Sequence, residues 1–179
     1  CRSLTTINIP ESVTSIGDLA FSECSSLTTI NIPERVTSIG DSAFACCESL
    51  ASVTIPDRVT SIGSGSFSYC KSLTTVNMPE NVTSIGDSAF SRCESLASVT
   101  IPDSVTSIGD SAFSSCYVLT TIDIPDSVTS IGLYAFRHCI SLRYAIIPTN
   151  LEGENESYWT DRGIDLKQTT LITQEQLSD

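Results

Sequence analysis

The chain has 179 residues, of which 40% are hydrophobic and 17% are charged, a composition typical of a folded chain rather than a disordered one. Its net charge of −12, with only nine Lys and Arg residues, excludes nucleic acid and anionic membrane surfaces as expected partners, because their binding depends on cationic side chains. No apolar run reaches the roughly 18 residues of a transmembrane helix, so we expect no membrane insertion of these residues.

A 23-residue unit repeats through most of the chain. The seven prolines lie 23 residues apart from Pro10 to Pro148, and the six phenylalanines keep the same step from Phe21 to Phe136. Seven of the eight cysteines also follow this period. A fixed period of this length predicts a stacked array, in which each unit buries its apolar face against its neighbours. We expect this array to occupy residues 1–148.

The first part of each unit predicts a short strand. With Cys1 as position 1, Leu4 to Ile9 reads L-x-x-I-x-I, and the proline at position 10 ends the strand because it cannot donate to a sheet ladder. Successive copies should lie parallel and about 4.8 Å apart, with the rest of each unit as the crossover.

The crossover has two parts. V-T-S-I-G predicts a second extended piece that ends at a glycine able to take positive φ. G-D-S-A-F-S then predicts one turn of α- or 3₁₀ helix that packs the phenylalanine inward. The aspartates expected to act as helix N-caps are Asp18, Asp41, Asp87 and Asp110.

The whole pattern, L-x-x-I-x-I-P-x-x-V-x-x-I-G-x-x-A-F-x-x-C, resembles the BspA-type leucine-rich repeat, a class found in surface proteins of bacteria and of some parasitic protists. The resemblance covers residues 1 to about 151. It implies a repeat solenoid: a right-handed leucine-rich-repeat stack of parallel strands with short extended or 3₁₀ crossovers, with six full coils and a partial seventh. It also implies a surface-exposed or secreted module for adhesion to host matrix proteins or other cells.

Positions 6 and 8 of each unit should point out of the sheet, because positions 7 and 9 point inward. The residues at these positions form the candidate partner-binding face: Thr6, Asn8, Thr29, Asn31, Ser52, Thr54, Thr75, Asn77, Ser98, Thr100, Thr121 and Asp123. They are small and polar, and they include none of the Trp, Tyr and Arg side chains that dominate interface hot spots. A solvated ladder that only stabilises stacking is therefore an equal alternative.

The sequence assembles no recognisable catalytic, cofactor or metal site, so we expect no enzyme. The in-phase cysteines should be buried free thiols, because equivalent side chains in a stack point the same way. Cys46 precedes an in-phase cysteine and should be exposed, and His138 has no second histidine to work with. A weaker alternative is calcium held between the acids at positions 11 and 18. The sequons at Asn81 and Asn155 would be glycan candidates in a secreted eukaryotic chain.

The period fails from residue 149, and residues 149–179 are expected to form a C-terminal cap or a tail. Apolar residues accumulate at outward positions just before this segment: Tyr117, Val118, Leu133, Tyr134, Ile140, Tyr144 and Ile146. An apolar patch of this size is rarely left in water. We therefore expect the segment to fold back over it as a cap with Trp159 buried. The alternative is a partner-binding patch beside a loose tail.

These observations predict a non-catalytic protein-binding module, exposed on the cell surface or secreted, that binds through the strand face of the solenoid. The alternative is a structural scaffold or interaction subunit of an intracellular or organellar complex. Unpaired cysteines favour that alternative, because they suit a reducing compartment. No leader precedes the first repeat, so we expect any leader to lie outside these residues.

Overall fold

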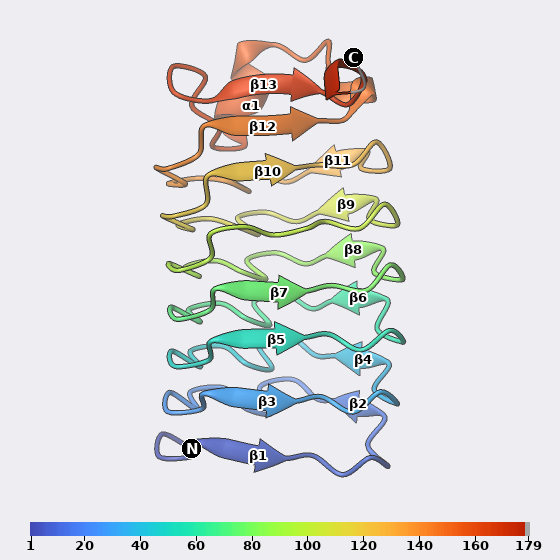
Figure 1. Ribbon diagram of the computed structural model, residues 1–179, viewed down its shortest axis with the longest axis vertical. Helices are drawn as coiled ribbons and strands as arrows, with labels where there is room; N and C mark the ends of the chain where they lie inside the picture. Colours follow the sequence, from blue (N-terminus) through green and yellow to red (C-terminus); the bar gives the residue numbers. More distant parts are fainter. Residues whose placement is uncertain (178–179) are drawn as a thin grey trace.

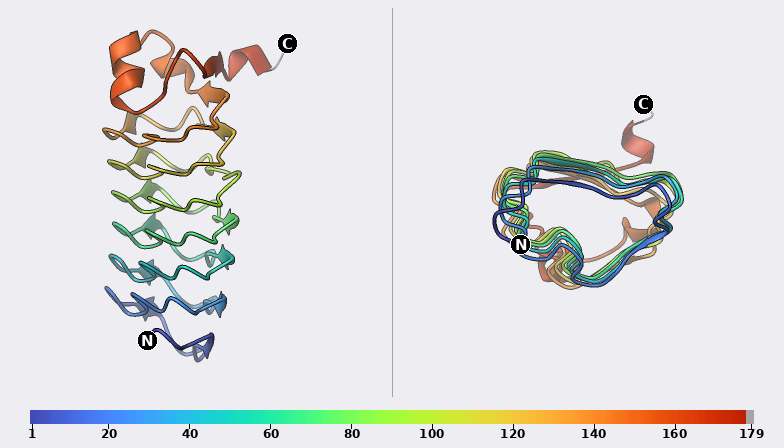
Figure 2. Two further views of the ribbon diagram at one scale, coloured as in Figure 1. Left: turned by 90° about the vertical axis from the view of Figure 1, so that its left-hand side faces the viewer. Right: turned by 90° about the horizontal axis from the view of Figure 1, so that it is seen from below.

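The computed structural model is a stack of coils that rises from the N-terminus, with the C-terminal segment lying over the last coil (Figure 1). It describes residues 1–177. Seen along the stack, each coil is a flattened ring, and successive rings superimpose closely (Figure 2). The predicted repeat solenoid is confirmed as a parallel β-solenoid of about seven turns.

One side of the stack carries the longer strands, and we call this side the strand face. Their partners are parallel and in register, so that each residue lies opposite its counterpart 23 positions along the chain. The strands are β1 (Thr6–Asn8), β3 (Thr29–Asn31), β5 (Ser52–Thr54), β7 (Thr75–Asn77), β10 (Thr121–Asp123) and β12 (Tyr144–Ile147).

The opposite side carries two-residue strands, which form one continuous six-stranded sheet. They are β2 (Ser15–Ile16), β4 (Ser38–Ile39), β6 (Ser61–Ile62), β8 (Ser84–Ile85), β9 (Ser107–Ile108) and β11 (Ser130–Ile131). The unbroken ladder therefore runs along the crossover side of the solenoid.

The ladder on the strand face is interrupted at two places. Its strands divide into the groups β1–β3, β5–β7 and β10–β12–β13, where β13 spans Thr170–Thr173 in the C-terminal segment. Residues 98–100 contribute only an isolated bridge from Thr100 to Asp123. Both breaks precede coils that have alanine at position 5, Ala51 and Ala97. Threonine at this position adds a hydroxyl bond to the preceding coil, as when Thr74 Oγ1 donates to Ala51 O at 3.1 Å. Alanine lacks this second tie between coils.

The segment predicted as a capped helical turn is a run of hydrogen-bonded turns without a helix, so the N-cap prediction is wrong. Each aspartate reaches across to the next coil instead. Asp18 Oδ1 accepts the backbone N–H of Asp41 at 2.8 Å, and Asp41 Oδ1 accepts that of Ser64 at the same distance. These carboxylates therefore tie coils together rather than capping their own coil.

The glycine at position 17 was expected to take positive φ, and this is also wrong. Positive φ occurs at positions 19 and 23, for example at Ser42 and Cys46. Glycine is required by close approach, because a Cβ on Gly40 would lie 2.6 Å from the backbone N of Asp18 in the coil below. Neighbouring coils are therefore packed backbone to backbone at this corner.

Backbone hydrogen bonds between coils run in opposite directions on different parts of the ring. Beside the two-residue strands, the later coil donates to the earlier one, as in Thr37 N to Thr14 O. At the end of β5 on the strand face the earlier coil donates, as in Ile55 N to Asn77 O. In the turn that carries the phenylalanine, the earlier coil donates to the later one, as in Phe21 N to Ala43 O. Between these ties, the phenylalanine rings form a column with centroids 5.3–5.7 Å apart.

The C-terminal segment contains η1 (Thr149–Leu151), α1 (Glu156–Asp161), β13 (Thr170–Thr173) and η2 (Glu175–Leu177). It packs against the last coil, and β13 extends the strand face by pairing in parallel with β12. Tyr134 N and Phe136 N donate to the carbonyls of Asp161 and Arg162 at the end of α1, at 2.7 and 2.8 Å. Trp159 is 1% exposed, which confirms its predicted burial. The segment thus both donates hydrogen bonds to the last coil and accepts them from it, as another coil would.

Candidate functional site

The candidate partner-binding face is open to solvent along the whole stack. All twelve of its residues are exposed, while the intervening side chains of the central coils, such as Val53 and Val76, are buried. The predicted outward orientation is therefore confirmed, whereas a role in binding stays a prediction. Asn77 Nδ2 and Thr54 Oγ1 lie 3.4 Å apart, and the face otherwise presents hydroxyl and amide groups to solvent. Such a surface suits hydrogen bonding to another protein.

This polar chemistry ends at coil seven. Tyr144 and Ile146 occupy the outward positions there, and Tyr144 is 51% exposed. Ala145 between them is fully buried, as the alternation of a strand requires. The strand face therefore has a polar body and an apolar C-terminal end.

The prediction that the C-terminal segment covers the outward apolar residues is wrong for most of them. Five stay exposed: Val118, Leu133, Tyr134, Ile140 and Tyr144. Tyr117 and Ile146 are half-buried. The segment packs over the open end of the stack, where it supplies backbone partners and buries Trp159, and this leaves the five side chains exposed. Tyr134 instead packs beside the guanidinium of Arg137, 5.1 Å from its ring centroid.

A groove of about 560 Å³ lies beside the strand face at coils four to six. It is lined by Glu80, Thr100, Ile101, Pro102, Asp103, Asp123, Pro125, Asp126, Ser127 and Gln174. Four of these residues are acids, and two, Thr100 and Asp123, belong to the candidate partner-binding face. The sequence pattern of a single coil does not predict this groove.

A signal for the groove was present at position 12. Arg35 and Arg58 follow the position-11 acid in coils two and three, whereas Asn81, Ser104 and Ser127 stand there in coils four to six. The acids of the later coils therefore lack a neighbouring base in the sequence. Comparing charges between coils, rather than counting acids, predicts where negative charge is uncompensated.

The in-phase cysteines after Cys1 are buried, and all eight cysteines are free, which confirms the predicted thiols. The buried thiols lie close to phenylalanine carbonyls: Cys70 Sγ is 3.3 Å from Phe44 O, and Cys93 Sγ is 3.3 Å from Phe67 O. Burial raises the pKa of the Cys47 thiol to about 12 and that of Cys70 well above its ordinary value. These groups act as buried hydrogen-bond donors rather than nucleophiles.

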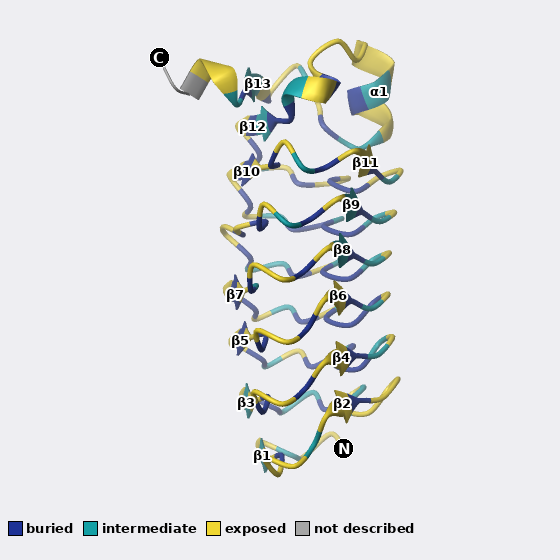
Figure 3. Ribbon diagram, turned by 90° about the vertical axis from the view of Figure 1, so that its right-hand side faces the viewer, coloured by how far each residue is buried: buried dark blue, intermediate teal, exposed yellow. Residues whose placement is uncertain are grey.

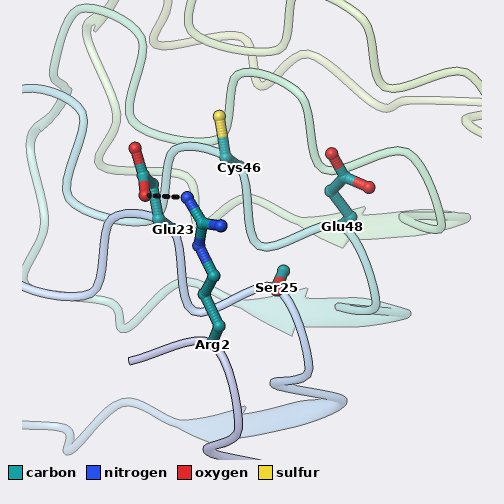
Figure 4. Close-up of a pocket in the computed structure, with 5 residues that line it drawn as sticks. All are labelled: Arg2, Glu23, Ser25, Cys46 and Glu48. Atoms are coloured by element: carbon teal, nitrogen blue, oxygen red, sulfur yellow. Dashed lines mark hydrogen bonds and ion pairs between the residues drawn. The ribbon is translucent and has the colours of Figure 1, made fainter.

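A second cleft, of about 400 Å³, is lined by Arg2, Glu23, Ser25, Cys46 and Glu48 (Figure 4). Arg2 Nη2 and Glu23 Oε2 form an exposed ion pair at 3.2 Å. Cys46 is half-exposed, and its pKa is raised first by burial and then by the charges of Glu23 and Glu48. A thiol with a raised pKa is a weak nucleophile at neutral pH. His138 lies four coils away and offers no base here.

No cation or membrane site is apparent among residues 1–177. No group of three or more His, Cys, Asp and Glu side chains within them is arranged to hold a metal ion. The position-18 carboxylates that were considered for calcium are engaged by backbone N–H groups, as for Asp87 with Asp110 N at 2.8 Å. Over the same residues, no helix has both the length and the apolar character needed to span a bilayer.

Comparison with known proteins identifies the family of this repeat. The chain matches the family model described as BspA type leucine rich repeat region, in six copies over residues 1–119 and 66–173. No curated protein matches it. A leucine-rich repeat protein of T. pallidum is 31% identical with a TM-score of 0.64, over 81% of this chain and 63% of that one.

Two further solved structures are similar. A leucine rich cell surface protein of Faecalibacterium prausnitzii is 31% identical with a TM-score of 0.53, over 83% of this chain and 62% of that one. A leucine-rich repeat protein of Bacteroides ovatus is 25% identical with a TM-score of 0.57, over 98% of this chain and 58% of that one. This chain thus spans less than two thirds of the length of each relative.

Proposed function

Because this chain belongs to the family of BspA-type leucine-rich repeat regions, we propose that it is a non-catalytic protein-binding module on a cell surface or in secreted form. In this proposal, the strand face attaches to host matrix proteins or to other cells. The cell-surface description of the F. prausnitzii relative supports the location. The observation that carries the binding role is the exposure of all twelve residues of the candidate partner-binding face.

The geometry favours attachment at many points over one enclosed pocket. Equivalent hydroxyl and amide groups recur at each coil, and the strands that carry them are held in register. Repeated weak contacts on one rigid body gain strength through effective concentration, without any single tight contact. An extended, repetitive ligand such as a matrix protein fits this arrangement.

The test is adhesion of the immobilised protein to purified matrix proteins and to cultured cells. Thr75→Arg combined with Asn77→Arg places bulk and charge in the middle of the strand face, and we expect it to abolish adhesion with the melting temperature unchanged, because both side chains are solvated. The matched control is Ser61→Arg, an exposed position in the opposite sheet. Retained adhesion by the double variant, or equal loss in the control, contradicts the proposal.

A second candidate function is supported by the free cysteines. An array with eight free thiols suits a reducing compartment, where it would serve as an interaction subunit of a larger complex. Fractionation of the source cells with an antibody to the array distinguishes the two functions. Recovery from intact cells after surface labelling supports the first, and recovery only from a soluble internal assembly supports the second.

A further inference from the structure

The C-terminal end of the strand face carries a platform of three apolar side chains. Tyr144 and Ile146 point outward from β12, and β13 places Ile172 directly opposite Ile146 in register. Leu171, the neighbour of Ile172, packs against the core, while Ile146 and Ile172 lie outside the core cluster. We call Tyr144, Ile146 and Ile172 the apolar platform. Coils one to six have only Thr, Ser, Asn or Asp at these outward positions.

Next to the platform lies uncompensated negative charge. The position-11 acids of coils four to six, Glu80, Asp103 and Asp126, are exposed and line the groove described above. The ion pairs formed within residues 1–177 are Arg2–Glu23 and Lys71–Glu48, and neither involves these acids. The groove therefore presents carboxylates that a cationic partner can pair with.

The platform and the groove are continuous. Asp123 lines the groove and lies opposite Ile146 in the register of β10 and β12. A carboxylate of the groove and an aliphatic side chain of the platform are therefore direct neighbours on the strand face. Gln174 Nε2 donates to Asp123 Oδ1 at 2.7 Å and also lines the groove. Immediately after it, η2 projects outward from the strand face (Figures 2 and 3). The projection follows the end of β13, the strand that carries Ile172 of the platform.

We propose that the apolar platform and the acidic groove together form a docking site for a basic protein segment, in which Lys or Arg alternates with apolar side chains. This inference rests on the proposed function, since it takes the strand face as the binding surface and names the part of it that binds most strongly. Desolvated aromatic and aliphatic anchors supply most of the energy of an interface, and complementary charge sets the choice of partner. A segment of alternating residues meets both requirements at once.

The test uses the full chain and a defined probe, a fluorescein-labelled peptide in which lysine alternates with phenylalanine and valine. Binding is followed by fluorescence anisotropy. We expect saturable binding that weakens as salt rises from about 0.05 to 0.15 M, because exposed charges are screened over that range. Two control peptides should each bind at least about tenfold more weakly than the lysine peptide. One has glutamate in place of lysine, and the other has alanine in place of phenylalanine and valine.

The variants separate the two halves of the site. Tyr144→Thr with Ile146→Asn gives coil seven the outward residues of coils one, two and four, so the fold is preserved while the platform is removed. Glu80→Gln with Asp103→Asn removes charge from side chains that make no hydrogen bond within the described residues. Each pair should weaken binding about tenfold, and only the charge pair should flatten the dependence on salt.

The outcomes also separate this inference from the proposed function. Thr6→Arg with Asn8→Arg changes the strand face at coil one, three coils from Glu80 and six from Tyr144, and should leave peptide affinity unchanged while it weakens adhesion. Peptide binding that survives Tyr144→Thr with Ile146→Asn, or equal binding of the glutamate peptide, overturns the docking site and leaves the adhesion result standing. Loss of peptide binding with both face variants also overturns it, because the site would then not be local to coil seven.

Discussion

The carboxylate of Asp87 accepts the backbone N–H of Asp110, its counterpart one coil later, at 2.8 Å. Asp87→Ala should therefore destabilise the array by about 1 kcal/mol, because one tie between coils is lost. Asp87→Asn should cost less, since its amide oxygen is also an acceptor. Urea unfolding of the three proteins measures the differences. An alanine variant as stable as the parent would show that this bond contributes nothing.

The chain contains its own complementary control. Coil three has Ser64 at this position, and within the described residues Asp87 N has no hydrogen-bond acceptor. Ser64→Asp should supply one and stabilise the array by about 1 kcal/mol. A gain at coil three together with a loss at coil four identifies the carboxylate tie as the cause.

Alkaline pH should destabilise the protein through its buried thiols. An unfolded cysteine loses its proton near its ordinary pKa of 9.0, whereas burial raises the folded pKa of Cys47 to about 12 and that of Cys70 well above the ordinary value. The folded state therefore holds more protons in this range, so the stabilising effect is complete below about pH 8.5 and is lost as pH rises from about 9 to 12. Each such thiol contributes a slope of up to about 1.4 kcal/mol per pH unit.

The measurement is the urea midpoint from pH 7 to pH 10. The informative comparison is with Cys93→Ala, which removes a thiol whose pKa is also raised by burial in the parent. This variant should be less stable at pH 7 and should lose stability less steeply with pH. Parallel pH profiles would contradict the thiol origin of the effect.

The C-terminal segment should stabilise the array as a cap. Truncation after Thr149 removes β13, α1 and the carbonyls that accept from Tyr134 N and Phe136 N, which exposes the last coil. We expect a lower melting temperature and aggregation on heating. Truncation after Leu177 retains those elements and is the control. A monomeric protein with unchanged melting temperature after the longer truncation would show that the segment is not a cap.

The core of this cap is Trp159, so Trp159→Ala should cost about 3–5 kcal/mol, as for other buried aromatic residues. Lys167→Ala, at an exposed position in the same segment, should change the free energy of unfolding by less than about 0.5 kcal/mol. Urea unfolding distinguishes the two variants. Similar small effects in both would mean that the segment contributes little to stability.

Much of the fold could be predicted from the sequence because each coil repeats the same local pattern. The alternation through Ile7 and Ile9 identified the strand and its outward side, and the spacing of proline and phenylalanine identified the stack. The aspartate and glycine roles could not be predicted within one unit, because the partner of Asp18 is a backbone N–H in the next coil and the neighbour of Gly40 is the backbone of the previous one. Single-coil patterns do not contain contacts between coils.

The candidate site was predicted in part for a related reason. The exposed columns follow from strand alternation, so residues such as Thr75 and Asn77 were identified correctly as outward-facing. The groove depends on two features that coil five lacks, a complete strand and a base at position 12. It also depends on Gln174, which comes from the segment outside the repeat. The extension of the apolar platform by Ile172 depends on the pairing of β13, which lies where the period has failed.

The opposed directions of hydrogen bonding make the junctions between internal coils equivalent. At these junctions the earlier coil donates at the phenylalanine turn, as in Phe44 N to Ser66 O, and the later coil donates beside the two-residue strands, as in Thr83 N to Thr60 O. Excising or inserting one 23-residue unit therefore leaves all remaining junctions matched and both ends unchanged. The reach of the strand face becomes an adjustable length that changes in steps of about 4.8 Å, the spacing of neighbouring strands. The length of the strand face can therefore change without any change in the chemistry of the two ends.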